Sequence, residues 1–265
     1  MQSCKNYSIP RKKKRYFCTK FHAVQFIFLR QTTSTNAFLL QMAEEDCVGK
    51  VVWTACQTAG KGMGTNVWES EPGKNLTFSM GVDMSFMKAP DQFLLSQAVP
   101  LGLLDVLDER LPADSLKVKW PNDLYFGNRK MGGILINSTV HGMDMGVSVI
   151  GIGLNVNQMA FHDWPTRPIS MKMILGHDVE LEPLLAQIVQ AIDHRVQQLK
   201  TGEGTIAIRE EYLNRLYRYR TWADYVVAGA KVRRYITGVD TFGRLQTIDE
   251  SGDLSVYDVK EIVFL

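Results

Sequence analysis

Residues 116–136 constrain the fold of this chain more than any other stretch, because they predict two paired strands with a charged residue on the second. Val118 and Trp120 alternate with lysines, which is the two-residue period of a half-buried strand. A Pro-Asn-Asp triplet interrupts that run, and a second apolar run follows a Gly-Asn pair. Lys130 therefore lies where a hairpin re-enters the fold.

The position of Lys130 suggests that it binds an anion. Gly132 and Gly133 follow it closely, and glycines let a ligand approach the backbone. A cation on a rigid strand beside them can form a charge-assisted contact. We take Lys130 as the candidate central cation of a site. The alternative is a solvated lysine at the end of a hairpin, because most lysines are exposed.

The length and composition indicate a folded globular protein. A chain of 265 residues suits one large domain, or a main domain with a small module, and can bury a sizeable core. Hydrophobic residues make up 45% of the chain and charged residues 22%, which are globular values. No stretch of the sequence is long and apolar enough to predict a membrane span.

The charge is distributed unevenly along the chain. Eight Lys and Arg residues and no acidic residue precede Glu44, which leaves 22 basic and 28 acidic residues in the remainder. The basic run at residues 11–15 favours a disordered leader over residues 1–22, with a nucleic-acid patch or a signal-peptide segment as alternatives. The apolar run at residues 21–29 has no small-residue cleavage site, which argues against secretion.

The cysteines predict neither a disulfide framework nor a zinc site. The chain has Cys4, Cys18, Cys47 and Cys56, without CxxC spacing and without histidines arranged around them. The simple interpretation is reduced thiols in a cytoplasmic protein.

A polar triplet follows the first predicted strand of the main body, residues 24–30. Ser34, Thr35 and Asn36 can cap a helix over residues 37–45. Hydroxyl groups at a strand-to-helix turn can equally offer fixed hydrogen-bond donors and acceptors to a ligand.

A glycine-rich loop follows the second predicted strand, residues 51–57. Gly60, Gly62 and Gly64 allow backbone N–H groups to turn towards an anion, and Lys61 adds a charge. The loop is neither a Walker A motif nor a Rossmann fingerprint, so a flexible surface loop is the alternative. Trp68 closes the loop and can either stack on a purine or anchor the loop in the core.

The remaining segments complete a mixed α and β pattern. Strands are predicted at residues 75–83 and 145–155, and helices at 91–110, with a kink or break at Pro100, 180–200 and 206–217. The second of these strands ends in GIGLNVN, where Gly151 and Gly153 let the strand pass close to a ligand. Short apolar runs separated by turns over residues 225–265 predict a small β-barrel, with a boundary near Arg220.

Five of these motifs together resemble the biotin protein ligases. QTAGKG in the glycine loop, KWPND followed by Lys130 and GGIL, and GIGLNVN occur in the order and approximate spacing of that family. The Ser-Thr-Asn triplet and the C-terminal barrel correspond as well, so the resemblance covers roughly residues 24–265. Larger members carry an N-terminal winged-helix DNA-binding domain. Only about 22 residues precede the first strand here, so the expected type is the short, monofunctional one.

The resemblance implies a fold and a reaction. The fold is an α+β catalytic domain like those of class II aminoacyl-tRNA synthetases, a mixed sheet flanked by helices over residues 23–220, and then a Src-homology-3-like barrel over residues 221–265. The reaction is the formation of biotinyl-5′-AMP from biotin and ATP, followed by transfer of biotin to a lysine of a biotin carboxyl carrier protein. Magnesium is expected to bridge the polyphosphate, and no protein-bound metal site is implied.

The resemblance also implies the residues of the site. The catalytic set is Lys130, Lys61 and Asp123, where Asp123 orients or deprotonates the incoming amine, or merely caps the turn after Pro121. The implied biotin contacts are Ser34, Thr35, Asn36, Gln57, Gly60, Lys61, Gly62, Met63, Lys130, Gly133, Gly151 and Gly153. The implied contacts of ATP and the adenylate are Lys61, Gly62, Gly64, Trp68, Lys119, Asn122, Lys130 and Asn155.

The glycine loop departs from the family pattern, which commonly reads GRGRxGR or GRGQxG. Lys61 stands in place of an arginine, Met63 takes the fourth position, and Gly64 comes one place early. Lysine keeps the charge but loses the bidentate fork, so we expect weaker retention of the adenylate. Two other functions compete with the biotin ligase: a lipoate protein ligase, and a biotin-sensing DNA-binding regulator, for which the basic run is the support.

Overall fold

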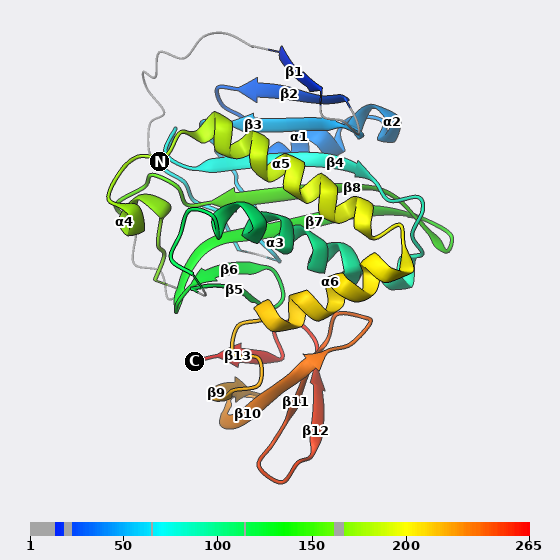
Figure 1. Ribbon diagram of the computed structural model, residues 1–265, viewed down its shortest axis with the longest axis vertical. Coiled ribbons are helices and arrows are strands. Elements are labelled where there is room, and N and C mark those ends of the chain that lie inside the picture. The colour runs from blue at the N-terminus through cyan, green and yellow to red at the C-terminus, as the bar shows by residue number, and fades with distance from the viewer. Residues whose placement is uncertain (1–13, 19–22, 65, 114, 162–166) are drawn as a thin grey trace.

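The computed structural model describes residues 14–18, 23–64, 66–113, 115–161 and 167–265 (Figure 1). Its body is one mixed sheet of eight strands in the order β1-β2-β3-β4-β8-β7-β6-β5. Neighbouring strands are antiparallel except for β2 and β3, which run parallel. The strands are β1 (Lys14–Cys18), β2 (Ala23–Leu29), β3 (Lys50–Thr54), β4 (Leu76–Asp83), β5 (Leu116–Lys119), β6 (Asp123–Phe126), β7 (Arg129–His141) and β8 (Asp144–Leu154).

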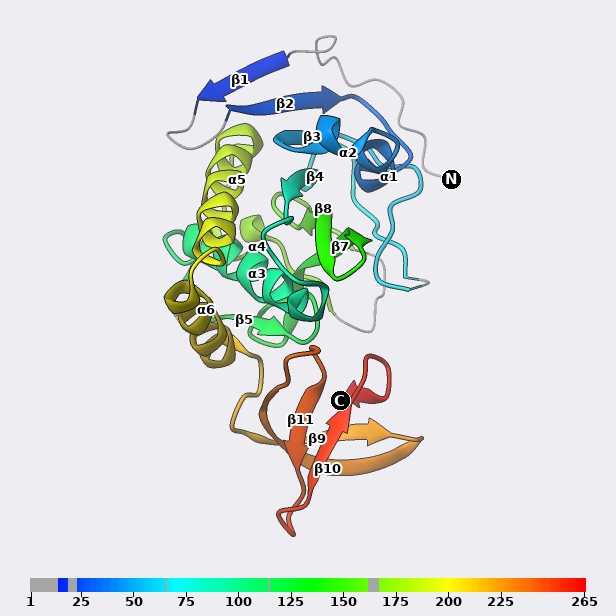
Figure 2. The ribbon, with the colours of Figure 1, turned by 90° about the vertical axis from the view of Figure 1, so that its right-hand side faces the viewer.

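Three long helices cover one face of this sheet, and two short helices lie on the other (Figures 1 and 2). The long helices are α3 (Phe93–Leu107), α5 (Leu181–Gln198) and α6 (Gly202–Arg215). The short ones are α1 (Thr35–Leu40) and α2 (Glu44–Cys47), and α4 (Met171–Leu175) lies beside the end of the sheet. The expected mixed sheet flanked by helices is therefore confirmed.

The helices form where the hydrophobic pattern predicts them. In α5 the buried residues include Leu184, Ile188, Ile192 and Val196, which follow the 3.6-residue period and face the sheet and α3. Helix α3 runs through Pro100 as one element, so of the two expected outcomes, a kink or two consecutive pieces, the second is wrong. Packing on nearly every side of α3 offsets the hydrogen bond that the proline removes.

Residues 116–136 form three strands instead of two. The triplet after Trp120 leads into β6, which pairs with β5 on one side and with β7 on the other. Three apolar or aromatic residues in a row, Leu124, Tyr125 and Phe126, are sufficient for a short strand between the two that the sequence predicts. Lys130 lies at the beginning of β7.

The expected disordered leader is wrong for five of its residues. Lys14–Cys18 form β1, which pairs antiparallel with β2. Without it the backbone groups along that edge of β2 would lack partners within the sheet. The other residues of the 1–22 segment, including most of the basic run, lie outside the described residues.

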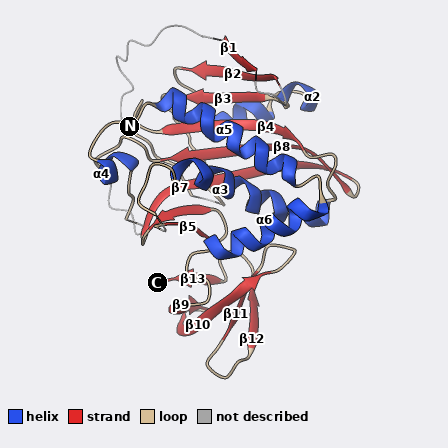
Figure 3. Cartoon of the chain, in the orientation of Figure 1, coloured by secondary structure: helices blue, strands red, loops and turns tan. Residues whose placement is uncertain are grey.

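A second sheet of five antiparallel strands follows, and Figure 3 shows it below the main sheet. Its order is β12-β11-β10-β9-β13, with β9 (Trp222–Val227), β10 (Ala230–Val239), β11 (Leu245–Ile248), β12 (Leu254–Tyr257) and β13 (Ile262–Phe264). Within these strands no ladder joins β12 to β13. Closure into a Src-homology-3-like barrel, and a domain boundary near Arg220, therefore stay predictions.

The two sheets share one hydrophobic core. One continuous cluster contains Trp120 and Leu216 from the main body together with Tyr225 and Ile236 from the second sheet. The indole Nε1 of Trp120 donates a hydrogen bond to the carbonyl of Gly243, at 2.7 Å, in the turn before β11. The second sheet is therefore fixed against the KWPND segment.

The cysteines differ from the sequence expectation in one respect. Cys47 is a free thiol, and burial raises its pKa. Cys56 is disulfide-bonded, so the expectation of reduced thiols is wrong for this residue. None of the helices in the described residues is both long and apolar enough to cross a lipid bilayer.

Candidate active site

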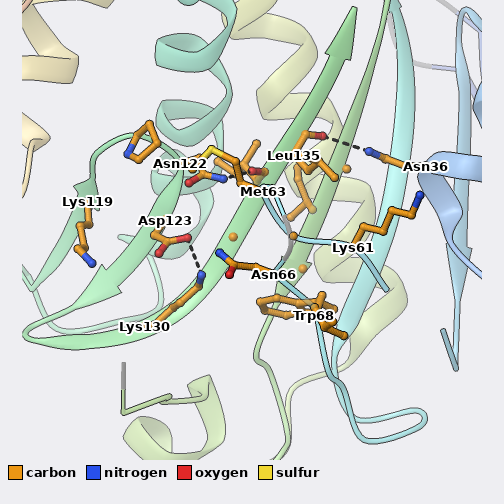
Figure 4. A pocket seen from close by; sticks show the side chains of 18 of the residues that line it. Asn36, Lys61, Met63, Asn66, Trp68, Lys119, Asn122, Asp123, Lys130 and Leu135 are labelled. Carbon is orange, nitrogen blue, oxygen red and sulfur yellow. Dashed lines mark hydrogen bonds and ion pairs between the residues drawn. The ribbon is translucent and has the colours of Figure 1, made fainter. Parts of the chain in front are cut away.

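A cavity of about 350 Å³ opens on the face of the main sheet that carries α1 (Figure 4). Its walls come from the beginning of α1, the glycine-rich loop, strands β4, β7 and β8, the KWPND segment, and the C-terminal residues around β13. The sequence motifs that lie far apart along the chain therefore meet in one place.

The register of the sheet explains how five of the lining residues come together. Thr77 on β4 pairs with Gly153 on β8, Gly153 pairs with Gly133 on β7, Gly133 with Asp123 on β6, and Asp123 with Lys119 on β5. Residues that pair directly across neighbouring strands point to the same face. This cross-strand row runs from a polar end at Thr77 to a charged end at Lys119.

A β-bulge brings Lys130 to this row. Side chains alternate along a strand, so Lys130 and Gly133, three residues apart, would ordinarily point to opposite faces. The pairing of β6 with β7 shifts by one residue between Leu124 and Tyr125, which inserts an extra residue into β7. As a result Lys130 Nζ lies 2.6 Å from Asp123 Oδ1, and both side chains are partly buried.

Lys119 is a second cation at the charged end. Its Nζ donates to the hydroxyl of Tyr125 at 3.2 Å and lies 5.1 Å from the centre of the Phe264 ring. Burial is the main cause that lowers the pKa of Lys119, the nearby Lys130 ammonium lowers it further, and Asp123 acts in the opposite direction. The folded protein therefore disfavours this charge, as expected of a cation that is held ready for an anionic ligand.

We predict that Lys119→Met raises the melting temperature of the protein. The same substitution should weaken the binding of an anionic ligand and any activity that depends on it. Below the lowered pKa both the folded and the unfolded chain carry the charge, so the cost of burying it is complete at pH 7. That cost disappears as the pH rises past 10.5, where the unfolded chain also loses the proton. The melting temperature at pH 7 should rise by roughly 2–4 °C, and the gain should shrink near pH 10.5. An equal gain at both pH values would contradict this origin.

A buried polar network forms the other end of the cavity. The backbone N–H of Thr35 donates to Gln57 Oε1 at 2.8 Å, and the Thr35 hydroxyl lies 2.7 Å from that of Ser79. Ser79 in turn donates to Asn36 Oδ1, whose amide donates to Asn137 Oδ1 at 3.1 Å. Ser34 also caps α1, because its Oγ accepts from the N–H of Ala37.

We predict that Ser79→Ala destabilises the protein, although Ser79 does not line the cavity. Its hydroxyl is fully buried and joins Thr35 to Asn36, so its loss leaves two buried polar groups short of a partner. Chemical denaturation should show a loss of about 1–3 kcal/mol in the free energy of unfolding. The exposed Ser85→Ala is the matched control and should change it by less than about 0.5 kcal/mol.

Two glycines of β8 are required by close contacts. A Cβ at Gly153 would lie 2.2 Å from Cε2 of Trp68, and one at Gly151 would lie 2.3 Å from Oδ1 of Asn36. The Trp68 indole therefore packs directly on the strand backbone, and its Nε1 is buried without a hydrogen-bond partner among the described residues. Trp68 both anchors the loop and forms part of the cavity wall.

The glycine-rich loop is folded on itself. The N–H of Gly62 donates to the carbonyl of Asn66 at 2.8 Å, and the N–H of Trp68 donates to the carbonyl of Gly60 at 3.1 Å. The Gly62 amide is thus already used within the loop, contrary to the prediction that it points to an anion. Lys61 is exposed at the edge of the cavity.

Most of the predicted site residues lie at the cavity wall. These are Ser34, Thr35, Asn36, Gln57, Lys61, Gly62, Met63, Trp68, Lys119, Asn122, Asp123, Lys130, Gly133, Gly151 and Gly153. Gly60 and Gly64 belong to the loop but are not part of the wall. Asn155 is buried behind it, where its backbone N–H donates to the carbonyl of Met131, so the structure does not place it as a direct contact.

Sequence reasoning missed three groups of residues. Thr77 and Ser79 have the two-residue spacing of one strand face, and a polar pair inside the apolar run of β4 was a usable signal. Asn66 and Val67 lie within the glycine-rich loop that the sequence predicts to be part of the site. The C-terminal residues Val259, Lys260, Ile262, Val263 and Phe264 carried no such signal, because only the folded chain brings them to the cavity.

The cavity carries a net positive charge. Its lysines are Lys61, Lys119, Lys130 and Lys260, and Asp123 is the one carboxylate among the described residues that line it. No cluster of three or more His, Cys, Asp or Glu side chains within the described residues could hold a metal ion.

Comparison with known proteins agrees with this site. Residues 28–155, which contain the loop, the KWPND segment and β8, match the model described as the Biotin/lipoate A/B protein ligase family. Biotin–protein ligase 1, chloroplastic, of Arabidopsis thaliana is 39% identical over 203 residues, which are 74% of this chain and 52% of that protein. The chain thus spans about half the length of this relative.

A shorter relative and a solved structure extend the comparison. Biotin–[acetyl-CoA-carboxylase] ligase of Paracoccus denitrificans is 29% identical over 231 residues, 85% of this chain and 91% of that protein. The biotin protein ligase of Aquifex aeolicus in complex with biotin and ATP shares the fold, with a TM-score of 0.74 and 20% identity over 91% of this chain and 98% of that one. Residues 28–155 are thus similar to the biotin/lipoate A/B protein ligase family, and the relatives that match a larger share of the chain are biotin protein ligases.

Proposed function

We propose that the chain is an ATP-dependent biotin protein ligase. The observation that carries the proposal is the cross-strand row, which joins a polar pocket at one end to paired charges at the other. The names of the Arabidopsis and Paracoccus relatives support the same activity. Within this proposal, biotin occupies the end near α1 and the phosphates of ATP lie near Lys119 and Lys130.

The polar end suits the ureido ring of biotin, and the middle of the cavity suits its apolar chain. The ring has two N–H donors and one carbonyl acceptor, which need a few placed polar groups at the end of an apolar tube. Thr35, Asn36 and Gln57 supply such groups. Gly133 leaves room for the chain to pass along the sheet, and the Trp68 indole over Gly153 offers it an apolar wall.

The charged end suits the first chemical step. A carboxylate oxygen of biotin attacks the α-phosphorus of ATP, the bond to the β-phosphate breaks, and pyrophosphate leaves. Negative charge builds up where two anions meet, and preorganised cations offset it. Lys130 and Lys119 are held at this end by Asp123 and Tyr125, so they do not have to reorganise during the reaction.

The second step is the transfer of the biotinyl group to a lysine of a biotin carboxyl carrier protein. The amine nitrogen attacks the acyl carbon, an amide bond forms, and AMP leaves with the bonding electron pair. The amine must lose a proton, and an ordinary lysine has a pKa near 10.4. Asp123 is the carboxylate of the cavity that can orient this amine or accept its proton.

Magnesium is proposed to enter with the nucleotide and not to occupy a site built by the protein. Asp123 alone among the described lining residues offers a carboxylate, and its Oδ1 is paired with Lys130. A Mg²⁺ ion prefers several oxygen ligands, which the triphosphate and water provide.

A cytoplasmic location forms part of the proposal because the reaction consumes ATP. The disulfide at Cys56 is unusual for a reducing compartment.

The test is a labelling assay with purified protein. The chain is incubated with ATP, Mg²⁺ and either biotin or lipoate, and a biotin carrier domain is then weighed by mass spectrometry. We expect one biotinyl group on one carrier lysine and no lipoyl group. The family model also covers lipoate ligases, so lipoyl transfer without biotinyl transfer would overturn the assignment in favour of that activity.

A further inference from the structure

Lys260 has an unusual backbone conformation in the turn between β12 and β13. Its φ is +77°, in the left-handed region that favours glycine over residues with a Cβ. The turn is closed by two hydrogen bonds, from the N–H of Asp258 to Glu261 Oε2 at 2.7 Å and from the N–H of Glu261 to the carbonyl of Asp258 at 3.1 Å. Strained residues that the surroundings hold in place are often found at ligand sites.

The side chain of Lys260 extends from the second sheet to the glycine-rich loop. A Cβ built on Gly64 would lie 2.9 Å from Lys260 Nζ and 3.3 Å from its Cε. Lys260 lines the same cavity as Lys119 and Lys130. Gly64 therefore lies beside this ammonium group, and its missing side chain leaves space around it.

Lys260 has no acidic partner within the described residues. The carboxylate of Glu261, its neighbour, accepts the hydrogen bond from Asp258 that closes the turn. Asp123, the one carboxylate among the described lining residues, pairs with Lys130. The Lys260 ammonium is therefore available to an anion in the cavity.

The anion that fits best is a polyphosphate. The four lysines and one aspartate of the cavity leave a net charge of about +3, whereas a biotin carboxylate carries one negative charge and the triphosphate of ATP carries up to four. The strand that follows Lys260, β13, places Phe264 against Lys119 at the charged side of the cavity. This side is the one assigned above to the phosphates.

We propose that Lys260 binds the triphosphate of ATP, so that the second sheet supplies a cation to the adenylation site. This inference rests on the proposed ligase function. It gives the C-terminal sheet a role in nucleotide binding. It also gives a reason for the conformation of Lys260, because the left-handed turn carries a side chain whose ammonium group reaches the glycine-rich loop.

The test variant is Lys260→Gly, which removes the cation and also relieves the backbone strain. We expect the melting temperature to be equal to or above that of the parent. The KM for ATP in biotin-dependent ATP–pyrophosphate exchange should rise about tenfold, the scale of one charge-assisted hydrogen bond at a partly exposed site. The KM for biotin should change by less than twofold, and Lys260→Arg should retain the affinity for ATP. Direct calorimetric titration with ATP gives a second readout that does not depend on turnover.

The matched control is Ala228→Gly, which relieves a positive φ of +50° in another turn of the same sheet without removing a charge. It should leave the KM for ATP unchanged. If the parent enzyme exchanges pyrophosphate and the Lys260→Gly variant has the same KM and the same affinity for ATP, the inference about Lys260 is wrong and the ligase function stands. If the parent shows no biotin-dependent exchange, the proposed function fails, and the inference fails with it.

Discussion

Replacing Lys130 by alanine should lower biotin-dependent ATP–pyrophosphate exchange by about a thousandfold. The variant loses the cation nearest to the reacting groups, and it also leaves the Asp123 carboxylate uncompensated where a second anion must bind. Both effects raise the barrier to adenylate formation, so kcat should fall and the KM for ATP should rise. Initial rates measured with labelled pyrophosphate at several ATP concentrations separate the change in kcat from the change in the KM for ATP.

Lys117→Ala is the control for this experiment. Lys117 lies on β5 two residues before Lys119, and its Nζ donates to the carbonyl of Asn214 outside the cavity. It should lose less than threefold in rate. A Lys130→Ala enzyme with the exchange rate of the parent would show that the bulge of β7 does not supply the catalytic cation, and the proposed mechanism would fail.

Gly153→Ala should abolish biotin binding, or weaken it by at least about a hundredfold. The added methyl group would lie 2.2 Å from Cε2 of Trp68, so the indole has to leave the wall of the cavity. Because the neighbouring groups are packed, this overpacking should also lower the free energy of unfolding by about 1–3 kcal/mol. Isothermal titration with biotin and chemical denaturation measure the two effects.

Gly238→Ala is the matched control, because this glycine also lies in a strand but its nearest neighbour is the end of the flexible Gln246 side chain, at 3.2 Å. It should bind biotin as the parent does. If Gly153→Ala retained parental affinity, Trp68 would not form the ligand site in the way the structure indicates.

Local patterns predicted much of the cavity. Alternation identified the strand that contains Val118 and Trp120, and the glycines at the end of β8 marked a place where a ligand can approach the backbone. The order of the motifs then indicated that they meet. Asn155 shows the limit of this reasoning, because a residue can stand at the end of the correct motif and still lie behind the wall, with its backbone bonded to Met131.

The position of Lys130 could not be derived from the sequence. An alternating pattern assigns it to the face opposite Gly133, and the extra residue in β7 reverses that assignment. The contribution of residues 259–264 was equally hidden, because it depends on how the second sheet rests on the first and not on any local signal. The β-bulge in β7 and the long-range packing of the second sheet therefore determine which charged side chains reach the cavity.

The hydrogen bond between Trp120 and Gly243 couples the unfolding of the two sheets. The indole N–H is buried in the core, so detaching the second sheet would leave it without a partner as well as exposing apolar surface. The same tryptophan precedes the turn that contains Asn122 and leads to Asp123, the first residue of β6. We therefore expect heat or denaturant to melt both sheets in one cooperative transition, in which loss of the smaller one also dismantles the catalytic centre.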